Sequence, residues 1–230
     1  MIDLVGITLL NESKVILKDF DLKVRTGEII GLLGLSGSGK SHILSLASGA
    51  LVPKKGRMRL EGCDVTNQRQ KLKEATALST PDILGPYHLS VDSWLEYWLS
   101  LYDVPNINQV KIDVLNQLEL NDIHLTLVKD LSLGQRRMLD IARLLAIDPK
   151  IYLLDSPDTG LDGKAFRKLI KLIRALSDKG KTVIIATNFP SLPIKSCTRC
   201  VEVKNGQIVE EKRAGTDGYS DFISKAQGWV

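Results

Sequence analysis

The chain carries Gly34-Leu-Ser-Gly-Ser-Gly-Lys-Ser41, which fits the phosphate-loop pattern G-x-x-x-x-G-K-[ST] at every fixed position. The apolar run Glu28–Leu33 precedes it, and residues 42–48 follow with apolar side chains at helical spacing. The predicted order is strand, glycine-rich loop and helix. This order directs the backbone N–H groups of the loop and the positive end of the helix dipole onto one anionic group. The stretch therefore predicts a site for the phosphates of a nucleotide.

Individual residues of this loop have predicted roles. Gly37 and Gly39 allow the backbone to curl, Lys40 reaches the β- and γ-phosphates, and the Ser41 hydroxyl coordinates Mg²⁺. Asp155 ends a predicted buried strand, where a carboxylate can hold the Mg²⁺ shell together with Ser41. The predicted nucleotide-binding set is Gly34, Leu35, Ser36, Gly37, Ser38, Gly39, Lys40, Ser41, His42 and Asp155.

The composition is that of an ordinary globular protein. The 230 residues include 31 basic and 27 acidic side chains, for a net charge of +4, and 43% of the residues are hydrophobic. These values exclude a disordered, collagenous or coiled-coil chain, and a chain of this length can bury a full core. The small net charge gives no reason to expect a nucleic-acid partner. No apolar stretch approaches the roughly 18 residues of a membrane span, and residues 1–4 begin no secretory signal, so we expect a cytoplasmic protein.

The three cysteines are Cys63, Cys197 and Cys200. The last two form a lone C-x-x-C, which can belong to a redox pair or to half of a zinc site. A zinc site needs four ligands, and the sequence has neither a second cysteine pair nor a nearby histidine. We therefore expect structural cysteines beside a strand.

Apolar strands alternating with amphipathic helices predict an α/β fold with a mainly parallel sheet. Strands are expected at Ile2–Leu10, Phe20–Val24, Glu28–Leu33, Arg57–Glu61, Ile151–Asp155, Thr182–Thr187, and in a hairpin of Val201–Val203 with Gln207–Glu210; a turn is expected at Asn11–Ser13. Helices are expected at His42–Ser48, Val91–Tyr102, Val110–Leu120, from a cap at Ser132 to about Ile147, and at Gly163–Ser177.

We expect one domain over residues 1–230 with two appended parts. The helical stretch of about 85–147 interrupts the alternation and should form an inserted lobe. The tail, residues 211–230, contains Tyr219, Phe222, Ile223 and Trp229 and should pack on the domain as a short helix.

Further motifs resemble the ABC ATPase family, the nucleotide-binding subunits of ABC transporters. They are LSLGQRR at 131–137, IYLLDSPDTGLD at 151–162 and the pair Thr187-Asn188, and the resemblance extends over residues 2–210. It implies a P-loop NTPase core with a mainly parallel sheet, an N-terminal antiparallel β region and a helical lobe. It also implies ATP and Mg²⁺ as cofactors.

In this family two nucleotide-binding domains stack head to tail, and each ATP lies between the phosphate loop of one and the signature segment of the other. The signature segment here is Leu131–Gln135. The resemblance implies that Ser132, Gly134 and Gln135 would complete the site of a partner. Leu133 stands at a glycine position that the family allows to vary, and Asp162 ends the D-loop.

Several family positions of the hydrolytic machinery hold other residues. Ser156 stands where the family has its catalytic Glu, and Asn188 where it has the switch His. The interlobe Gln should fall near Ser79-Thr80, yet residues 71–108 contain no Gln. An adenine-stacking aromatic is missing near Leu10-Asn11. These departures predict nucleotide binding with little hydrolysis.

Neither His42 nor Asp158 alters that expectation. His42 takes the place of the Thr that usually follows the phosphate-loop Ser. Asp158 lies three residues past Asp155 on a loop, and we do not expect it to replace the missing base.

The function expected from the resemblance is an ATP-binding subunit docked on the cytosolic face of a membrane through a membrane-spanning transporter subunit. The alternative is a soluble nucleotide-gated interaction module that takes no part in transport. Pairing could be with a second copy or with another ABC ATPase subunit, and the intact signature segment favours the latter. Trp94 and Trp98, one helical turn apart, could form a docking surface or pack within the lobe.

Overall fold

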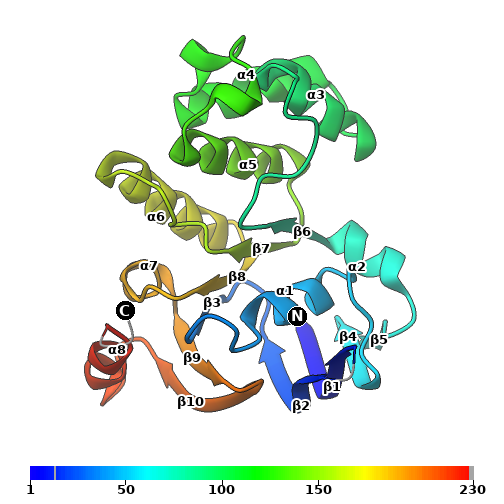
Figure 1. Cartoon of the computed structure of the whole chain (residues 1–230), viewed down its shortest axis with the longest axis vertical. Coiled ribbons are helices and arrows are strands. Elements are labelled where there is room, and N and C mark those ends of the chain that lie inside the picture. Colours follow the sequence, from blue (N-terminus) through cyan, green and yellow to red (C-terminus); the bar gives the residue numbers. More distant parts are fainter. Residues whose placement is uncertain (13, 228–230) are drawn as a thin grey trace.

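The computed structural model describes residues 1–12 and 14–227 and stacks two β-sheets and a helical lobe along one long axis (Figure 1). The strands are β1 (Ile2–Asn11), β2 (Lys14–Val24), β3 (Ile29–Leu33), β4 (Lys55–Leu60), β5 (Cys63–Asp64), β6 (Thr76–Ser79), β7 (Ile151–Asp155), β8 (Thr182–Thr187), β9 (Arg199–Lys204) and β10 (Gln207–Arg213). The helices are α1 (Lys40–Ala47), α2 (Arg69–Ala75), α3 (Val91–Leu101), α4 (Ile107–Leu118), α5 (Leu133–Ile147), α6 (Gly163–Asp178), α7 (Ser191–Ser196) and α8 (Tyr219–Gln227).

The larger sheet has the strand order β10-β9-β3-β8-β7-β6, and every neighbouring pair except β10-β9 is parallel. Its central strands are buried on both faces, as parallel strands covered by helices must be. Alternate residues face different cores: Ile29 and Leu33 join the core below the helices, whereas Ile30 and Leu32 join the core shared with the smaller sheet.

The smaller sheet is antiparallel, with the order β2-β1-β4-β5. Helix α1 packs between the two sheets, and its buried side chains Ile43, Leu44 and Leu46 belong to the core that both sheets share. This packing fixes the direction in which α1 leaves β3. The phosphate loop is thus held between two rigid elements.

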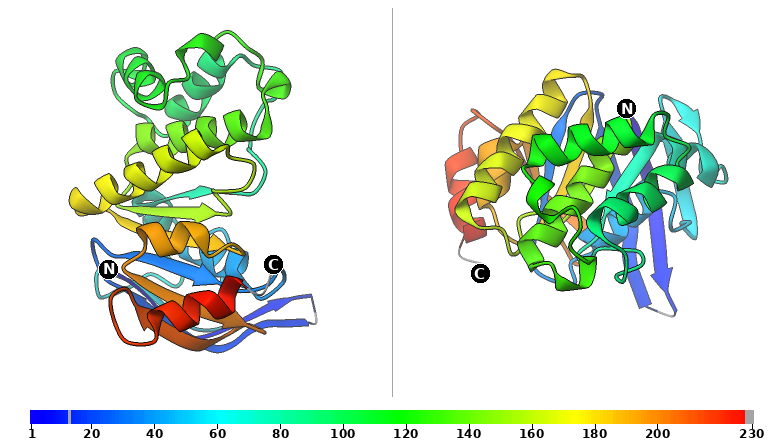
Figure 2. Two further views of the ribbon diagram at one scale, coloured as in Figure 1. Left: turned by 90° about the vertical axis from the view of Figure 1, so that its left-hand side faces the viewer. Right: turned by 90° about the horizontal axis from the view of Figure 1, so that it is seen from above.

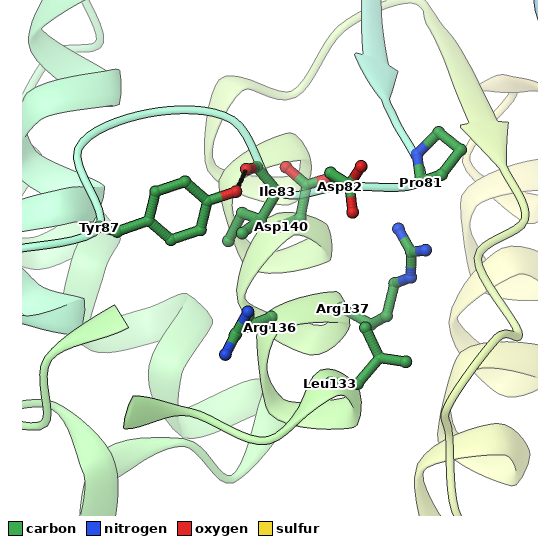
Figure 3. Close-up of a pocket in the computed structure, with 8 residues that line it drawn as sticks. All are labelled: Pro81, Asp82, Ile83, Tyr87, Leu133, Arg136, Arg137 and Asp140. Carbon is green, nitrogen blue, oxygen red and sulfur yellow. Dashed lines mark hydrogen bonds between the residues drawn. The ribbon is translucent and has the colours of Figure 1, made fainter. Parts of the chain in front are cut away.

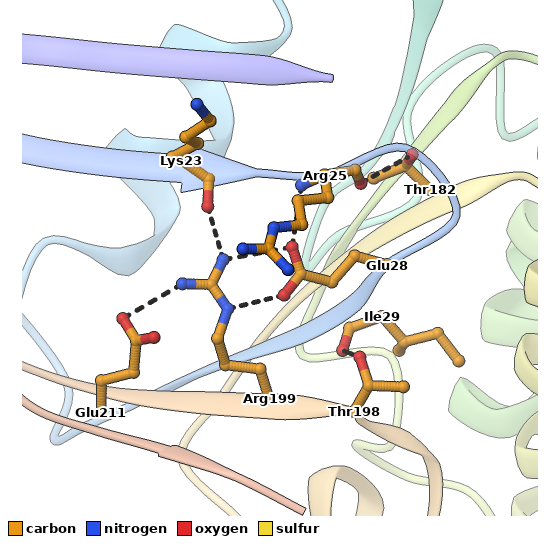
Figure 4. A network of polar contacts seen from close by, with 8 residues as sticks. All are labelled: Lys23, Arg25, Glu28, Ile29, Thr182, Thr198, Arg199 and Glu211. Carbon is orange, nitrogen blue, oxygen red and sulfur yellow. Dashed lines mark hydrogen bonds and ion pairs between the residues drawn. The ribbon is translucent and has the colours of Figure 1, made fainter.

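A buried ion-pair network ties the two sheets together (Figure 4). The guanidinium of Arg199 on β9 donates to Glu28 before β3 at 2.6 Å and to Glu211 on β10 at 3.1 Å, and it also donates to the carbonyl of Lys23 on β2. Because these partners favour the charged form, they raise the pKa of Arg199 against the opposing effect of burial. The charge is well compensated, as a buried guanidinium requires.

The helical lobe consists of α3, α4 and α5 and lies beyond α6, away from the smaller sheet (Figures 1 and 2). Trp94 is fully buried in it, while Trp98 is partly buried and packs at its edge. Of the two roles considered for these tryptophans, docking and packing, Trp94 therefore has the packing role. None of the helices in the described residues combines the length and apolar character that a membrane crossing requires.

The fold expected from the sequence is confirmed, with corrections at some element boundaries. Strand β2 begins at Lys14, six residues before the expected start, because its pairing with β1 extends to the pair of Asn11 and Lys14. Helix α4 runs from Ile107 to Leu118 and ends at Glu119, which adopts the left-handed conformation. Helices α2 and α7 and strands β5 and β6 were not expected.

The tail begins later than expected, since β10 extends to Arg213. Helix α8 follows, with Phe222 and Ile223 buried against the core. Trp229 lies outside the described residues, as does Ser13 of the predicted turn.

Cys197, just before β9, and Cys200, within β9, are buried, and their thiols are free. Within residues 1–12 and 14–227 no group of three potential metal ligands occurs.

Candidate nucleotide-binding site

The phosphate loop bends sharply between β3 and α1, and its glycines are needed for this path. Gly34, Gly37 and Gly39 have φ angles of +154°, +79° and +109°. A Cβ on Gly34 would lie 2.2 Å from the carbonyl oxygen of Val203, so no other residue fits there without a shift of β9. A Cβ on Gly37 would meet nothing within 4 Å, so its positive φ angle is the reason for a glycine there.

Lys40 folds back into this loop. Its ammonium donates to the carbonyls of Gly34 at 2.7 Å and Leu35 at 2.9 Å, and to the Ser38 hydroxyl at 3.2 Å. Burial lowers the pKa of Lys40 to about 8, although Asp155 acts in the opposite direction. The cation is therefore held by neutral carbonyls, which an anionic phosphate would outcompete.

The donors present fit the phosphates of a nucleotide. No side chain caps the N-terminus of α1 and no acidic residue lies in its first turn, so its free N–H groups and helix dipole favour an anion. Ser41 is exposed in the first turn of α1, while Asp155 is buried at the end of β7. These two oxygen donors suit Mg²⁺, which prefers carboxylates, hydroxyls and water.

Parallel pairing brings the remaining predicted residues to the same edge of the sheet. Leu33 pairs with Thr187 and Asp155 with Ala186, so β3, β7 and β8 end side by side. Ser156 follows in the left-handed conformation, with φ +49°, and its N–H donates to the carbonyl of Ala186 at 2.7 Å. Its hydroxyl donates to Asp155 at 3.3 Å. A serine hydroxyl at this position is no base for an attacking water.

Asp158 lies closer to this edge than its place on a loop indicates. The Thr187 hydroxyl is 3.1 Å from one of its carboxylate oxygens and 3.3 Å from the other. Burial raises the pKa of Asp158, while Thr187 and the charge of Arg137 lower it. The neighbouring Asn188 is half-buried. The carboxylate of Asp158 is thus tied to the switch position and is not free at the strand end.

Arg137 is a site-adjacent residue that the sequence reasoning missed. It lies on α5, two residues past Gln135, and its guanidinium donates to the carbonyl of Thr80 at 2.6 Å. Thr80 follows the buried Ser79 at the end of β6, which is the place that the family resemblance gives to the interlobe Gln. This contact could not be predicted from the sequence, because the acceptor lies 57 residues away in the chain.

The signature segment forms the N-terminus of α5 and satisfies its own polar groups. The Ser132 hydroxyl accepts from the Gln135 N–H at 3.2 Å, and the Gln135 side chain accepts from the Ser132 N–H at 2.8 Å. This capping box fixes the start of the helix, as expected for Ser132. The exposed side chain of Leu133 contacts Gly160, where a Cβ would lie 2.5 Å from it.

The D-loop packs directly on the signature segment. A Cβ on Gly134 would lie 2.8 Å from the Gly160 carbonyl oxygen, and Asp162 caps α6 by accepting from the Ala165 N–H at 2.8 Å. Ser132, Gly134, Gln135, Gly160 and Asp162 line one open cleft of about 410 Å³. No residue of the phosphate loop lines it. The predicted site residues thus form two separate groups on this chain.

Comparisons with known proteins agree with this arrangement. Residues 17–159 match the family model described as ABC transporter. The chain is 32% identical over 193 residues to the probable sulfate/thiosulfate import ATP-binding protein CysA of Chlorella vulgaris, a match that covers 83% of this chain and 81% of that protein. It is 30% identical over 203 residues to the methionine import ATP-binding protein MetN of Carboxydothermus hydrogenoformans, covering 83% of this chain and only 58% of that protein.

The fold is also that of a solved dimeric ATP-binding cassette in a post-hydrolysis state bound to ADP and Pi. The TM-score is 0.82 at 24% identity, and the match covers 94% of this chain and 100% of the other.

Proposed function

The chain belongs to the ABC transporter family as an ATP-binding subunit, and from this premise we propose that it holds ATP with Mg²⁺ but hydrolyses it slowly or not at all. The observation that carries ATP binding is the phosphate loop itself. Its curled backbone, the uncapped N-terminus of α1 and the inward-folded Lys40 present donors to one anionic group. Ser41 and Asp155 are the proposed Mg²⁺ ligands.

Weak hydrolysis is proposed because the described residues at the ends of β7 and β8 offer no free base for the attacking water. Ser156 stands at the end of β7 beside Asp155, and its hydroxyl is engaged with that carboxylate. Asp158 is bound by Thr187, and Asn188 has no titratable group. Positioned bases are typically worth about 10²–10⁴ in rate, so their loss leaves slow turnover at most.

Pairing with a second nucleotide-binding subunit is the next part of the proposal. Ser132, Gly134 and Gln135 lie with Asp162 along a cleft that no phosphate-loop residue of the same chain reaches. An intact helix N-terminus of this kind suits the γ-phosphate of an ATP bound by a partner. We favour a partner with its own catalytic residues, because this gives the preserved signature segment a catalytic use.

A membrane-spanning transporter subunit is the proposed second partner, and it would hold the chain at the cytosolic face of the membrane. A groove of about 670 Å³ runs between the core and the helical lobe, and exposed Leu84, Leu101 and Tyr102 line it beside Trp98. Exposed apolar side chains gathered along one groove are typical of a protein contact. A helix of the membrane subunit is the occupant that this groove suits.

The test of ATP binding is isothermal titration calorimetry with ATP and Mg²⁺ on the purified chain. Lys40→Ala should weaken binding by about tenfold to a hundredfold, since it removes a charge-assisted contact to phosphate. Lys71→Ala, on the exposed face of α2, is the matched control and should bind like the parent. Equal affinities for Lys40→Ala and Lys71→Ala would show that the phosphate loop is not the site.

The test of pairing is native mass spectrometry of the complex purified in detergent from its own cells. A second nucleotide-binding chain together with a membrane subunit is the expected result. Two copies of this chain as the sole nucleotide-binding subunits would exclude the mixed pair. Cytosolic partners alone would exclude the transport role.

A further inference from the structure

Two neighbouring arginines on α5 make different connections (Figure 3). The guanidinium of Arg136 donates to the carbonyls of Leu131 at 3.0 Å and Lys129 at 3.1 Å, both within the helical lobe. The guanidinium of Arg137 instead extends towards Pro81 and donates to the Thr80 carbonyl, directly after β6 of the core. Arg137 therefore connects the helical lobe to the core, and Arg136 does not.

The joint around Arg137 is buried and contains polar atoms without partners. Arg137 is 5% exposed and Asp140 2% exposed, and both line a cavity of about 30 Å³ that also includes Asp82 and Tyr87. Arg137 Nε and Asp140 Oδ2 have no hydrogen-bond partner among the residues that the structure describes. Buried polar atoms of this kind are uncommon and costly. These two atoms could therefore form hydrogen bonds if the helical lobe took a second position relative to the core.

The charge of Arg137 acts on the nucleotide side of the sheet. Arg143, six residues further along α5, is neutralised by Asp140 at 2.7 Å. Within the described residues Arg137 forms no such ion pair. Burial lowers the pKa of Arg137, and the carboxylates that oppose this are Asp140, Asp82, Asp155 and Asp158. Two of these four carboxylates belong to the proposed Mg²⁺ edge and its loop.

We propose that Arg137 is a positioning residue that couples the helical lobe to the nucleotide site of this chain, in the interlobe place where the family's Gln is absent. The inference rests on the proposed binding of ATP with Mg²⁺ at Lys40, Ser41 and Asp155. Arg137 holds the Thr80 carbonyl, and Ser79 before it pairs with Leu154, the residue directly before Asp155. A shift of the strand ends when nucleotide binds is therefore passed to α5 and the signature segment. If bound nucleotide favours one position of the helical lobe by a certain factor, linkage requires that this position raises nucleotide affinity by the same factor.

The test measures the distance between the lobes by double electron–electron resonance on the full chain. One spin label is attached to Cys63, which is exposed on β5, and the other to an Ile112→Cys side chain on α4, where Ile112 is 53% exposed. Cys197 and Cys200 are buried and remain unlabelled. Distances are recorded without nucleotide and with ATP and Mg²⁺.

In the parent we expect one distance population that shifts when ATP and Mg²⁺ are added. Arg137→Met should broaden the nucleotide-free population and reduce the ATP-dependent shift to less than half. Arg136→Met is the matched control, because it removes an arginine that stays within its lobe, and it should behave like the parent. An Arg137→Met chain that keeps the full ATP-dependent shift overturns the proposal.

Two milder variants separate the charge from the hydrogen bond and remain informative if Arg137→Met does not fold. Arg137→Lys keeps a cation near Asp155 and should retain most of the shift.

Arg137→Gln keeps a donor for the Thr80 carbonyl but not the charge, and it should lose the shift. It should also tighten the Mg²⁺-dependent part of ATP binding by about two- to fivefold, because the positive charge that it removes repels Mg²⁺. A merely structural contact would make Arg137→Gln behave like the parent, and this result would overturn the proposal.

The ligand-free comparison keeps this test distinct from that of the proposed function. If calorimetry detects no ATP binding by the parent, the proposed function fails. Arg137→Met and Arg136→Met must still differ in the width of their nucleotide-free distance populations. Equal widths would overturn the role of Arg137 in the joint.

Discussion

The phosphate-loop edge of the core and the signature edge of α5 are both helix N-termini, but they satisfy their polar groups in different ways. At the phosphate loop, α1 has no side-chain cap and Lys40 is held only by carbonyls and a hydroxyl. At the signature edge, Ser132 and Gln135 cap each other. The first edge leaves backbone donors without a side-chain cap, while the second satisfies its donors with its own side chains.

The same two edges also differ in how many residues of the family's motifs they retain. Ser156 and Asn188 lie at the phosphate-loop edge, where groups that act on water would be required. The signature edge departs from the family pattern only at Leu133, which packs on Gly160 of the D-loop. This difference is the reason for proposing that the chain binds its own nucleotide but contributes to catalysis mainly through its signature segment.

The largest effect should come from restoring the missing groups at the phosphate-loop edge. Ser156→Glu combined with Asn188→His should raise steady-state phosphate release by about 10²-fold or more, the usual contribution of a positioned base. Ser156→Gln with Asn188→His is the control, because it matches the size of Glu without a basic carboxylate. A double variant that folds, binds ATP and shows no gain would contradict this assignment of the two positions.

A smaller effect should appear in the pH dependence of ATP binding. The pKa of Lys40 is about 8 without ligand, and bound phosphates favour its charged form, so binding takes up a proton above that pH. Affinity should therefore be full below about pH 7 and fall about tenfold between pH 8 and 9.5, as the lysine loses its charge.

This pH effect can be measured by calorimetry in buffers of different ionisation enthalpy, which reports the protons taken up. Lys40→Ala should bind weakly and show a flat profile over the same range. An affinity that rises with pH in the parent would refute the role given to Lys40.

The smallest effect is expected at the signature edge of the isolated chain. Ser132→Ala removes the cap of α5 and should lower the free energy of unfolding by about 1 kcal/mol, as measured by urea denaturation. ATP affinity should not change, since Ser132 lines a cleft that no phosphate-loop residue reaches. Ser132→Asn keeps a capping side chain and should restore most of the stability. Loss of ATP binding in Ser132→Ala alone would mean that the two edges are not independent.

The sequence predicted those features that depend on neighbours in the chain. The phosphate loop could be recognised because its glycines, Lys40 and Ser41 lie within eight consecutive residues. The cap at Ser132 was predictable for the same reason, since its partner Gln135 is three residues away. The parallel sheet followed from the continuous apolar runs of its central strands.

Contacts between distant segments could not be predicted in this way. Arg137 meets Thr80, and Asp158 meets Thr187, only after the sheet brings their elements together. Strand β6 has four residues, too few to show a period, although its end carries the interlobe joint. The start of β2 at Lys14 depends on its pairing with β1, which the residues of β2 alone do not reveal.

The central claim is that the phosphate-loop edge retains ATP without converting it. The most direct measurement is to incubate the purified chain with ATP and Mg²⁺, separate it from free nucleotide, and identify the bound nucleotide by chromatography. The account predicts intact ATP on the parent and an empty site on Lys40→Ala. Bound ADP, with phosphate released at several turnovers per second in the parent and none in Lys40→Ala, would contradict it.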